Sequence, residues 1–320
     1  MTYAIIFIML FVCELVYFKI ADKFNIIDKP NERSSHNYIT IRGGGIVFWA
    51  AAMLLLFLPL AINLLPFYIG ITLISAVSFI DDIKSLPNKI RIVIHFISIS
   101  CVFWGLGLFS TLNWRLIILA YIFFAGILNA YNFMDGINGI TGLYSLIVLI
   151  SLQFVNYQIV SFTQSDFVNF AIIACIVFLF FNFRKKAKCF AGDVGSMAIS
   201  FWIVMLLLQL MLKTNSIVWI MFLAIYGVDT VLTIIHRIYL KQNIFEAHRL
   251  HFYQILCNEK KFSHLLVSIL YAVIQLIICG IVIFIHFQFP KFELLSAILI
   301  LLALSLIYLL KFNFLKEKNI

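Results

Sequence analysis

The sequence predicts an all-α integral membrane protein, a polytopic bundle of about 10–11 transmembrane helices with candidate active-site loops on the cytoplasmic side. Three observations lead to this fold class. The chain is strongly apolar, its apolar runs recur from Thr2 to Leu310, and its polar loops alternate between rich and poor in positive charge.

The composition excludes an ordinary soluble protein. Of the 320 residues, 64% are hydrophobic and 12% are charged, and the mean hydropathy is +1.08, whereas a soluble domain carries about 25% charged residues. No soluble domain fits between the apolar runs, so residues 1–320 are predicted to form one polytopic domain. The six cysteines lie mostly in apolar runs without a CxxC spacing, which favours buried structural thiols over zinc or disulfides.

About eleven apolar segments are long enough to cross a bilayer, which takes roughly 20 residues each. Only Asn63 and Pro66 separate the second segment from the third. The first segment lacks the basic start and small-residue cleavage site of a signal peptide, so it is predicted to be a retained helix. The segments are residues 2–20, 44–62, 64–80, 91–109, 114–131, 138–156, 167–183, 195–212, 216–235, 263–287 and 292–311.

The connecting loops alternate strongly in charge. One set carries about twenty lysines and arginines, and the other carries only Arg115, Lys213 and Lys291. The positive-inside rule places the rich set in the cytoplasm, so the N-terminus is predicted outside and the C-terminus inside. The net charge of +9 follows from this asymmetry and favours anionic lipid and nucleotide near the surface. It is interpreted as a topology signal, and no nucleic-acid partner is expected.

Acidic side chains are costly inside a membrane and are functional candidates by default. A transporter would more often place them near the bilayer midplane. Glu14 is the one acid well inside a segment, and its side chain is expected to reach the cytoplasmic interface. Six others fall at or near predicted cytoplasmic helix ends: Asp28, Asp81, Asp82, Asp135, Asp193 and Asp229.

Two adjacent carboxylates, Asp81 and Asp82, close the third segment in the run SAVSFIDD. Such a pair is unfavourable unless a positive group neutralises it. Magnesium would do so because hard cations prefer oxygen ligands; the alternative is a solvated helix end, helped by Lys84. A third carboxylate, Asp193, stands in FAGDVGS before the eighth segment, where it could complete a magnesium site or cap the helix.

Amides cluster in the run NAYNFMDGING. The spacing of three places Asn129, Asn132 and Asp135 on one face if the helix continues that far. Gly136 and Gly139 then permit a tight turn and close approach of a ligand. Amides with a carboxylate suit a sugar, a ribose or a uracil, and a simple helix cap is the alternative.

The run EAHRLHFYQ brings His248, Arg249 and His251 within four residues. Arginine offers a planar fork for phosphate, and histidine donates hydrogen bonds to phosphate oxygens. Two histidines at this spacing could instead bind zinc, although no second ligand pair is evident. Near the N-terminus, the loop DKPNERSSHNYITIRGGG adds Arg42 and three consecutive glycines, which let the backbone approach a ligand or another helix.

With these motifs, the chain resembles the polyprenyl-phosphate N-acetylhexosamine-1-phosphate transferases, the MraY/WecA superfamily of glycosyltransferase family 4 type. The match runs in order, over about residues 28–254, through DKPNERSSH with RGGG, FIDD, NAYNFMDGING, FNF with FAGDVGS, and DT with EAHRLH. Each motif alone is weak, and together they are highly specific. The HRLHFYQ ending looks closer to the WbpL-like and WecA-like branch, which starts O-antigen or capsule chains, than to the pentapeptide transferases, which typically carry three histidines there.

The resemblance implies a multi-pass enzyme of the bacterial inner (plasma) membrane, commonly a homodimer. It implies transfer of N-acetylhexosamine-1-phosphate from a UDP-N-acetylhexosamine to undecaprenyl phosphate, with release of UMP. It also implies magnesium as the cofactor, with manganese as a substitute.

Carried over by matching position, the resemblance gives each motif residue a role. The catalytic residues would be Asp81, Asp82 and Asp193. Among these, Asp193 and Asp82 would bind the metal, and Asp81 would orient or deprotonate the lipid phosphate. Nucleotide or sugar binding would fall to Asn132, Asp135 and Asn182. The diphosphate and sugar end would be held by His248, Arg249 and His251.

Some positions depart from the commoner pattern. Ile39 and Ile41 stand where the first motif often has prolines, and Asn138 stands where an acid is frequent. Basic residues at 184–186 replace a proline-containing stretch after FNF. None of these changes removes a proposed metal or phosphate ligand.

Two other functions fit parts of the sequence. Within the same enzyme class, the alternative is a phospho-N-acetylmuramoyl-pentapeptide transferase of peptidoglycan synthesis, which the segment 248–251 argues against. From another class, a transporter of lipid-linked glycans predicts midplane polar groups, which are scarce. A catalytically inactive scaffold is disfavoured because Asp81, Asp82, Asp135 and Asp193 are all present.

Overall fold

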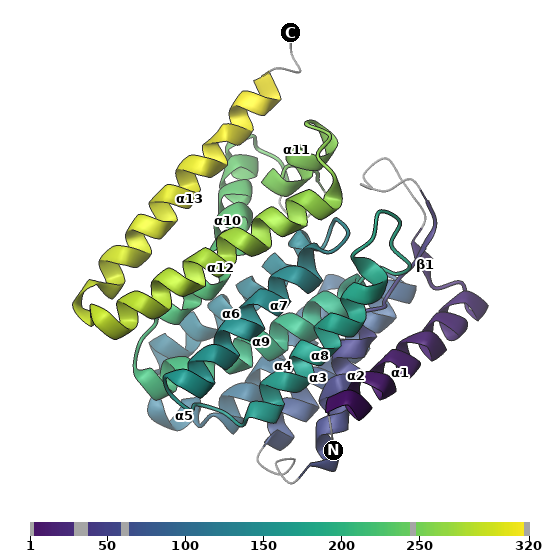
Figure 1. The fold of residues 1–320 in the computed structure, drawn as a ribbon, viewed down its shortest axis with the longest axis horizontal. Coiled ribbons are helices and arrows are strands. Elements are labelled where there is room, and N and C mark those ends of the chain that lie inside the picture. Colours follow the sequence, from purple (N-terminus) through teal and green to yellow (C-terminus); the bar gives the residue numbers. More distant parts are fainter. Residues whose placement is uncertain (1–2, 29–37, 59–63, 244–247, 317–320) are drawn as a thin grey trace.

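The computed structural model describes residues 3–28, 38–58, 64–243 and 248–316, and within them it is almost entirely helical (Figure 1). The predicted all-α polytopic fold is confirmed: nine described helices are long and apolar enough to cross a membrane. They are α1 (Tyr3–Lys23), α3 (Leu65–Ile83), α6 (Trp114–Met134), α7 (Ile140–Gln158), α8 (Ser165–Asn182), α9 (Gly192–Thr214), α10 (Ala224–Tyr239, continuing η3, Val218–Leu223), α12 (His264–Gln288) and α13 (Glu293–Lys316, following η4, Pro290–Phe292).

The other two predicted segments are also helical but differ from a standard span. The second contains α2 (Ile46–Leu54) and the 3₁₀ turn η1 (Leu55–Phe57), which together form a short apolar helix. The fourth contains α4 (Asn88–Gly105), which begins earlier than predicted and takes four polar or charged side chains into its first half. Two short helices, α5 (Leu108–Thr111) and α11 (Phe252–Asn258), lie in connections.

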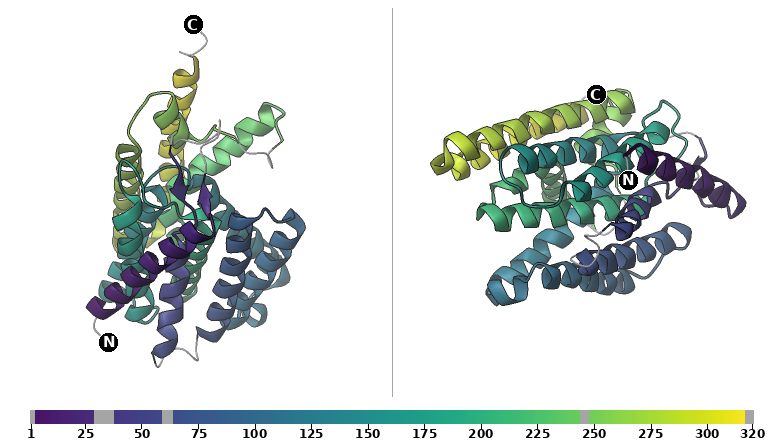
Figure 2. Two further views of the ribbon diagram at one scale, coloured as in Figure 1. Left: turned by 90° about the vertical axis from the view of Figure 1, so that its right-hand side faces the viewer. Right: turned by 60° about the horizontal axis from the view of Figure 1, so that its bottom comes forward.

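Helix α9 forms the centre of the bundle. It is buried along nearly its whole length, whereas α1, α6 and α13 leave most of their residues at least partly exposed. The α12–α13 pair lies along one side of the bundle, and α1 lies at the other (Figures 1 and 2). An exposed apolar periphery around a buried helix is what a lipid environment favours, because lipid tails solvate such side chains.

The chain ends are separated along the bundle. Helix α1 begins and α13 ends at opposite ends of the molecule, as an odd number of crossings requires (Figures 1 and 2). The strand β1 and the helix α11 both lie at the end that α13 reaches. Which end faces the cytoplasm stays a prediction from the charge pattern.

The loop after α1 is fastened to the loop before α9. Strands β1 (Ile27–Asp28) and β2 (Thr40–Ile41) pair antiparallel, with Asp28 opposite Thr40. The N–H of Phe190 donates to the carbonyl of Ile41 at 2.8 Å, and the N–H of Gly44 donates to the carbonyl of Phe190 at 2.8 Å. Segments about 150 residues apart in sequence therefore form one rigid platform.

Two glycines allow α2 and α9 to start in direct backbone contact. A Cβ atom on Gly45 would lie 2.2 Å from the Cα of Gly195, far inside van der Waals contact. The N–H of Gly45 donates to the carbonyl of Ala191 at 3.1 Å. The RGGG and GDVGS runs are thus two sides of a single contact, which only glycine permits.

Candidate active site

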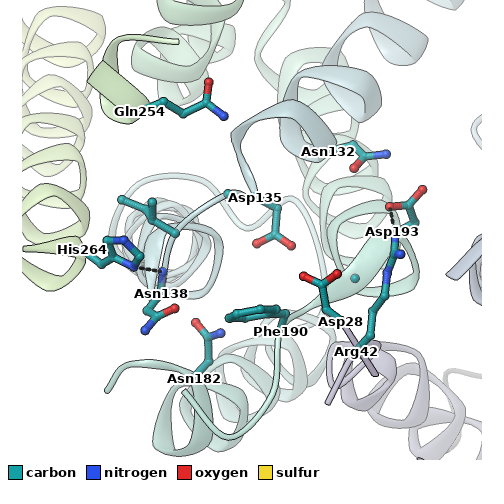
Figure 3. A pocket seen from close by; sticks show the side chains of 13 residues that line it. Asp28, Arg42, Asn132, Asp135, Asn138, Asn182, Phe190, Asp193, Gln254 and His264 are labelled. Carbon is teal, nitrogen blue, oxygen red and sulfur yellow. Dashed lines mark hydrogen bonds and ion pairs between the residues drawn. The ribbon is translucent and has the colours of Figure 1, made fainter. Parts of the chain in front are cut away.

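A polar cavity of about 220 Å³ lies where the motif-bearing loops meet (Figure 3). Its walls come from the loop after α1, the α6–α7 turn, the loop before α9, and the starts of α11 and α12. The lining residues are Asp28, Arg42, Asn132, Asp135, Gly136, Ile137, Asn138, Asn182, Phe190, Gly192, Asp193, Gln254 and His264.

Asp82 caps the helix that carries Asp193. Its Oδ1 accepts the N–H of Asp193 at 2.9 Å, and its Oδ2 accepts the N–H of Val194 at 3.0 Å. Gly192 makes this approach possible, because it has φ +71° and a Cβ there would lie 2.6 Å from Asp82 Oδ2. Two interactions stabilise the cap: hydrogen bonds to free N–H groups and a carboxylate at the positive end of a helix.

Two arginines link the three predicted catalytic aspartates. Arg42 Nε lies 2.7 Å from Asp82 Oδ1, and Arg42 Nη2 lies 3.5 Å from Asp193 Oδ1. Arg91 Nη1 lies 2.9 Å from Asp81 Oδ2, and Arg91 Nη2 lies 3.6 Å from Asp193 Oδ2. The structure therefore brings the three aspartates together as predicted, and it adds two cations that neutralise most of their charge.

Asp81 and Asp82 both have internal partners. Asp82 accepts two backbone N–H groups and pairs with the Nε of Arg42, so it holds Asp193 and the arginine in place, and its predicted role as a metal ligand stays a prediction. Asp81 accepts the N–H of Leu86 at 2.6 Å and pairs with Arg91, which fixes its orientation.

The turn after α6 places Asp135 in the cavity. The helix ends at Met134, so Asp135 lies at its C-terminal cap, and its carboxylate points into the cavity in Figure 3. Burial raises the pKa of the Asp135 carboxyl to about 7, and the negative charges of Asp193 and Asp82 act in the same direction. Asn129, predicted on the same face, is exposed and donates to the carbonyl of Ala125 instead.

Asn182 and Asn138 line the cavity while tying its loops together. Asn182 donates to the carbonyl of Cys189 at 2.8 Å and accepts the N–H of Gly139 at 2.7 Å. Asn138 donates to the carbonyl of Arg184 at 2.8 Å. These bonds fix the cavity wall. A ligand would contact Asn182 through the hydrogen-bonding capacity of its amide that these bonds do not use.

The sequence suggested that the Glu14 side chain reaches the cytoplasmic interface, but in the structure it is buried inside the protein. Its side chain is 1% exposed, and its Oε1 accepts a hydrogen bond from the Cys189 thiol at 3.6 Å. Because Cys189 belongs to the loop before α9, the acid lies beneath the platform rather than in solvent.

The HRLH segment borders the cavity without lining it. His251 is buried, and its Nδ1 lies 3.2 Å from Asp229 Oδ1. His248 accepts the N–H of Leu250 on Nδ1, and burial, together with nearby cationic groups, lowers its pKa to about 3. His248 is therefore a neutral donor through Nε2 at neutral pH, rather than a cation. The ring of His251 lies 6.2 Å from that of Phe133, beside Asn132.

The roles predicted for His248, Arg249 and His251 in holding the diphosphate stay predictions, because none of these side chains is among the lining residues. The preceding residues, 244–247, lie outside the described residues, as do residues 29–37 of the first motif. For zinc, the described part of the chain contains no group of three His, Cys, Asp or Glu side chains that could hold a metal.

Several residues in or beside the cavity were missed by the sequence reasoning. Asp28 was noted as an acid without a role, and Arg91 only as a topology charge, although each lies close to a motif. Phe190 begins the FAGDVGS run and Gln254 ends the HRLHFYQ run, so the motifs themselves held a signal for both. His264 had none, because only the packing of α12 against the α6–α7 turn brings it to the cavity.

The donor set around the cavity suits a hard divalent cation. The described residues form no complete metal site of their own. Magnesium, however, is usually bound through one or two carboxylates together with substrate phosphates and water. Asp193 and Asp135 supply such carboxylates beside a cavity large enough for phosphates, so the residues fit a metal that arrives with its substrate.

Comparisons with known proteins find similarity to one family of glycosyl transferases. Residues 64–211 match the model of glycosyl transferase family 4. A Bacillus subtilis protein named probable undecaprenyl-phosphate N-acetylglucosaminyl 1-phosphate transferase is 28% identical over 251 residues, covering 73% of this chain and 70% of the relative. The undecaprenyl-phosphate α-N-acetylglucosaminyl 1-phosphate transferase of Escherichia coli K12 is 26% identical, covering 64% of this chain and 61% of the relative.

A third relative belongs to another branch. The phospho-N-acetylmuramoyl-pentapeptide transferase of Dictyoglomus turgidum is 28% identical over 182 residues, covering 51% of this chain and 57% of the relative.

The fold and the cavity define a multi-pass membrane enzyme whose acidic and basic side chains meet at one end of a helical bundle. Over these stretches the chain is similar to the polyprenyl-phosphate hexosamine-1-phosphate transferases, as its motifs indicated.

Proposed function

We propose that this chain transfers an N-acetylhexosamine-1-phosphate from a UDP-sugar to undecaprenyl phosphate, releasing UMP and starting an O-antigen, capsule or related glycan. The names of the Bacillus and Escherichia relatives support the acceptor and the reaction. The observation that carries the proposal is the convergence of carboxylates, amides and an arginine from five distant segments on one cavity.

The reaction is a phosphoryl transfer. An oxygen of the lipid phosphate attacks the β-phosphorus of the UDP-sugar, and the bond from that phosphorus to the bridging oxygen breaks. UMP leaves with the bridging oxygen, and the sugar remains on a new lipid diphosphate. Such a transfer needs alignment and charge neutralisation more than covalent help from the protein.

The charged residues divide these tasks. Asp193 would hold magnesium, or manganese, together with the substrate phosphates, and Asp135, which lines the same cavity, would assist. The ion would supply positive charge at the diphosphate. Asp82 holds Asp193 in position, and Asp81, fixed by Arg91 and the Leu86 N–H, would orient the lipid phosphate.

The polar end of the cavity suits the nucleotide sugar. The Phe190 ring forms part of the wall and offers a flat face for stacking on a planar base (Figure 3). Asn132 and Asp135 offer hydrogen-bonding groups for a ribose or a sugar.

The direct test is a substrate panel. Purified protein, undecaprenyl phosphate and magnesium would be incubated with UDP-N-acetylglucosamine, UDP-N-acetylgalactosamine, a 6-deoxy variant and UDP-N-acetylmuramoyl-pentapeptide, with UMP release as the readout. Release with an N-acetylhexosamine donor supports the proposal. Release with the pentapeptide donor alone would assign the chain to the function of the Dictyoglomus relative, and no release with any donor would refute both.

The active site is proposed to face the cytoplasm of a bacterial plasma membrane, where UDP-sugars are made. Single cysteines placed near Asp166 and Lys291 should react with an impermeant thiol reagent added to intact cells, and cysteines near Arg42 and His248 should not. The reverse pattern would put the site on the wrong side for its donor. The proposal includes a homodimer, which light scattering of the purified protein would test.

A further inference from the structure

Five charged side chains form an alternating row at the edge of the cavity. In order they are Asp82, Arg42, Asp193, Arg91 and Asp81, so that each arginine lies between two carboxylates. Asp193 is the only member of this row that contacts both arginines. Counted by formal charge, the row holds three acidic and two basic side chains, which leaves one more acid than base in the middle of a site meant for anionic substrates.

The contacts in this row are unequal. The outer ones, from Arg42 to Asp82 and from Arg91 to Asp81, are 2.7 and 2.9 Å long. The inner ones, from each arginine to Asp193, are 3.5 and 3.6 Å long. Each guanidinium is therefore anchored to an outer aspartate and only loosely associated with Asp193. The side chains of Arg42 and Arg91 are also 35% and 26% exposed, so each retains surface that an anion can reach.

The two arginines face different surroundings. Arg42 is a lining residue of the polar cavity. Arg91 is not a lining residue and lies in the first turn of α4, next to Ile90 and Ile92, which are 47% and 66% exposed. Ile83, at the end of α3, is 55% exposed as well. Exposed apolar residues therefore flank Arg91 in the chain, and an exposed apolar surface is where a phosphate attached to a membrane lipid must arrive.

We propose that the two arginines bind the phosphates of different substrates, Arg42 the diphosphate of the nucleotide sugar in the cavity and Arg91 the single phosphate of the polyprenyl lipid at the membrane side. This inference rests on the proposed function. Each arginine exchanges its loose contact with Asp193 for phosphate oxygens while its anchor to Asp82 or Asp81 keeps the guanidinium aimed. Arginine suits this task because its planar fork binds phosphate with two hydrogen bonds. Asp193, released by both, faces the two phosphates between them.

The test separates the two Michaelis constants. Arg42→Gln should raise KM for the accepted UDP-sugar by at least about tenfold and leave KM for undecaprenyl phosphate within about twofold. Arg91→Gln should do the reverse. Binding without turnover gives a second readout: Arg42→Gln should weaken UDP binding in calorimetry, and Arg91→Gln should reduce retention of undecaprenyl phosphate in native mass spectrometry. Arg42→Lys and Arg91→Lys should restore each constant only in part.

Arg115→Gln is the matched control, because Arg115 also lies in the first turn of a helix, α6, and contacts no member of the row. It should change neither constant. The melting temperature of each variant shows that the protein is folded. The inference fails if both variants raise the same KM, raise both equally, or lower kcat alone. Wild-type protein that releases no UMP with any donor would instead refute the proposed function.

Discussion

Two buried aspartates, Asp82 and Asp229, place a carboxylate at the start of a helix in the same way. Asp82 accepts the first N–H groups of α9, those of Asp193 and Val194. Asp229 accepts the first N–H groups of α11, those of Phe252 and Tyr253, at 3.0 and 3.4 Å. Each also has a basic partner, an arginine in the first case and a histidine in the second.

The two caps differ in what surrounds them. Asp229 accepts hydrogen bonds from two further donors, the Tyr271 hydroxyl at 2.7 Å and the Thr233 hydroxyl at 3.2 Å. It also borders an apolar crevice between α10, α12 and α13. The helix capped by Asp82 instead presents Asp193 to a polar cavity beside a partly exposed Arg42. The same local chemistry therefore stabilises buried packing in one place and presents a carboxylate to a polar cavity in the other.

Removing divalent metal should have the largest effect, and it should affect the region around Asp82 and Asp193 but not the region around Asp229. EDTA should reduce UMP release to background, because the diphosphate then lacks its counter-charge, and magnesium or manganese should restore it. The melting temperature should stay unchanged, since the Asp229 region contains only internal partners. Full activity in EDTA would remove the metal from the mechanism.

Asp193→Asn should lower kcat by at least about a hundredfold, which is typical for loss of one aligned electrostatic group. UMP release at saturating substrates measures it. Asp166→Asn is the matched control, because Asp166 also lies in the first turn of a helix, α8, away from the cavity. Comparable loss in both variants would contradict a specific role for Asp193.

Exchanging the two caps for amides tests the comparison itself. Asp82→Asn should lower kcat/KM by about tenfold or more, because Asp193 and Arg42 lose their alignment. Asp229→Asn should mainly lower the melting temperature, because five hydrogen-bond donors surround the carboxylate and the asparagine amide replaces one of its two accepting oxygens with a donor. Activity per folded molecule and thermal melting give both values. A larger activity loss in Asp229→Asn would show that its region belongs to the catalytic machinery.

Arg249→Ala tests whether the HRLH segment belongs to the substrate site or only to the packing around Asp229. If the HRLH segment grips the diphosphate, this change should lower kcat/KM for the UDP-sugar by about tenfold or more at normal expression, and Arg249→Lys should recover only part of it. A near-native Arg249→Ala would limit the segment to packing around Asp229, and the diphosphate would be left to Arg42.

Asp135→Asn should give the smallest effect, visible in stability. A carboxyl whose pKa is about 7 in the folded protein, well above its unfolded value, destabilises the folded state increasingly as pH rises from about 4 to 7. In EDTA, the variant should therefore melt higher than wild type at pH 8 and close to it at pH 4. An equal difference at both values would show that the carboxyl is not held in this environment.

The helices could be predicted from the sequence because each depends on a local apolar run. The boundaries of α1, α3 and α9 fall within a few residues of the predictions. The fourth segment was misplaced at its start, because Lys89 and Arg91 end the apolar run although the backbone remains helical from Asn88. Such side chains lie at a helix end where they reach a polar environment, and hydropathy does not register this.

The site could be predicted only as far as its motifs extend. Asp81, Asp82 and Asp193 were placed together because family motifs contain them, and the structure confirms that they are neighbours. The arginines between them could not be assigned, because a positive charge near a cytoplasmic helix end is already explained by topology. Their contacts arise from the packing of α4, α9 and the first loop, which no local pattern encodes.

The contact between Gly45 and Gly195 has a consequence for reading mutational scans of this protein. Even alanine at either position would force the platform apart, by placing a methyl group 2.2–2.6 Å from the opposite Cα atom. Both glycines should therefore score as intolerant as the aspartates in a growth selection, although neither performs chemistry. A scan that also reports protein abundance would tell them apart, because the glycine variants should disappear from the membrane and an Asp193→Asn variant should accumulate there inactive.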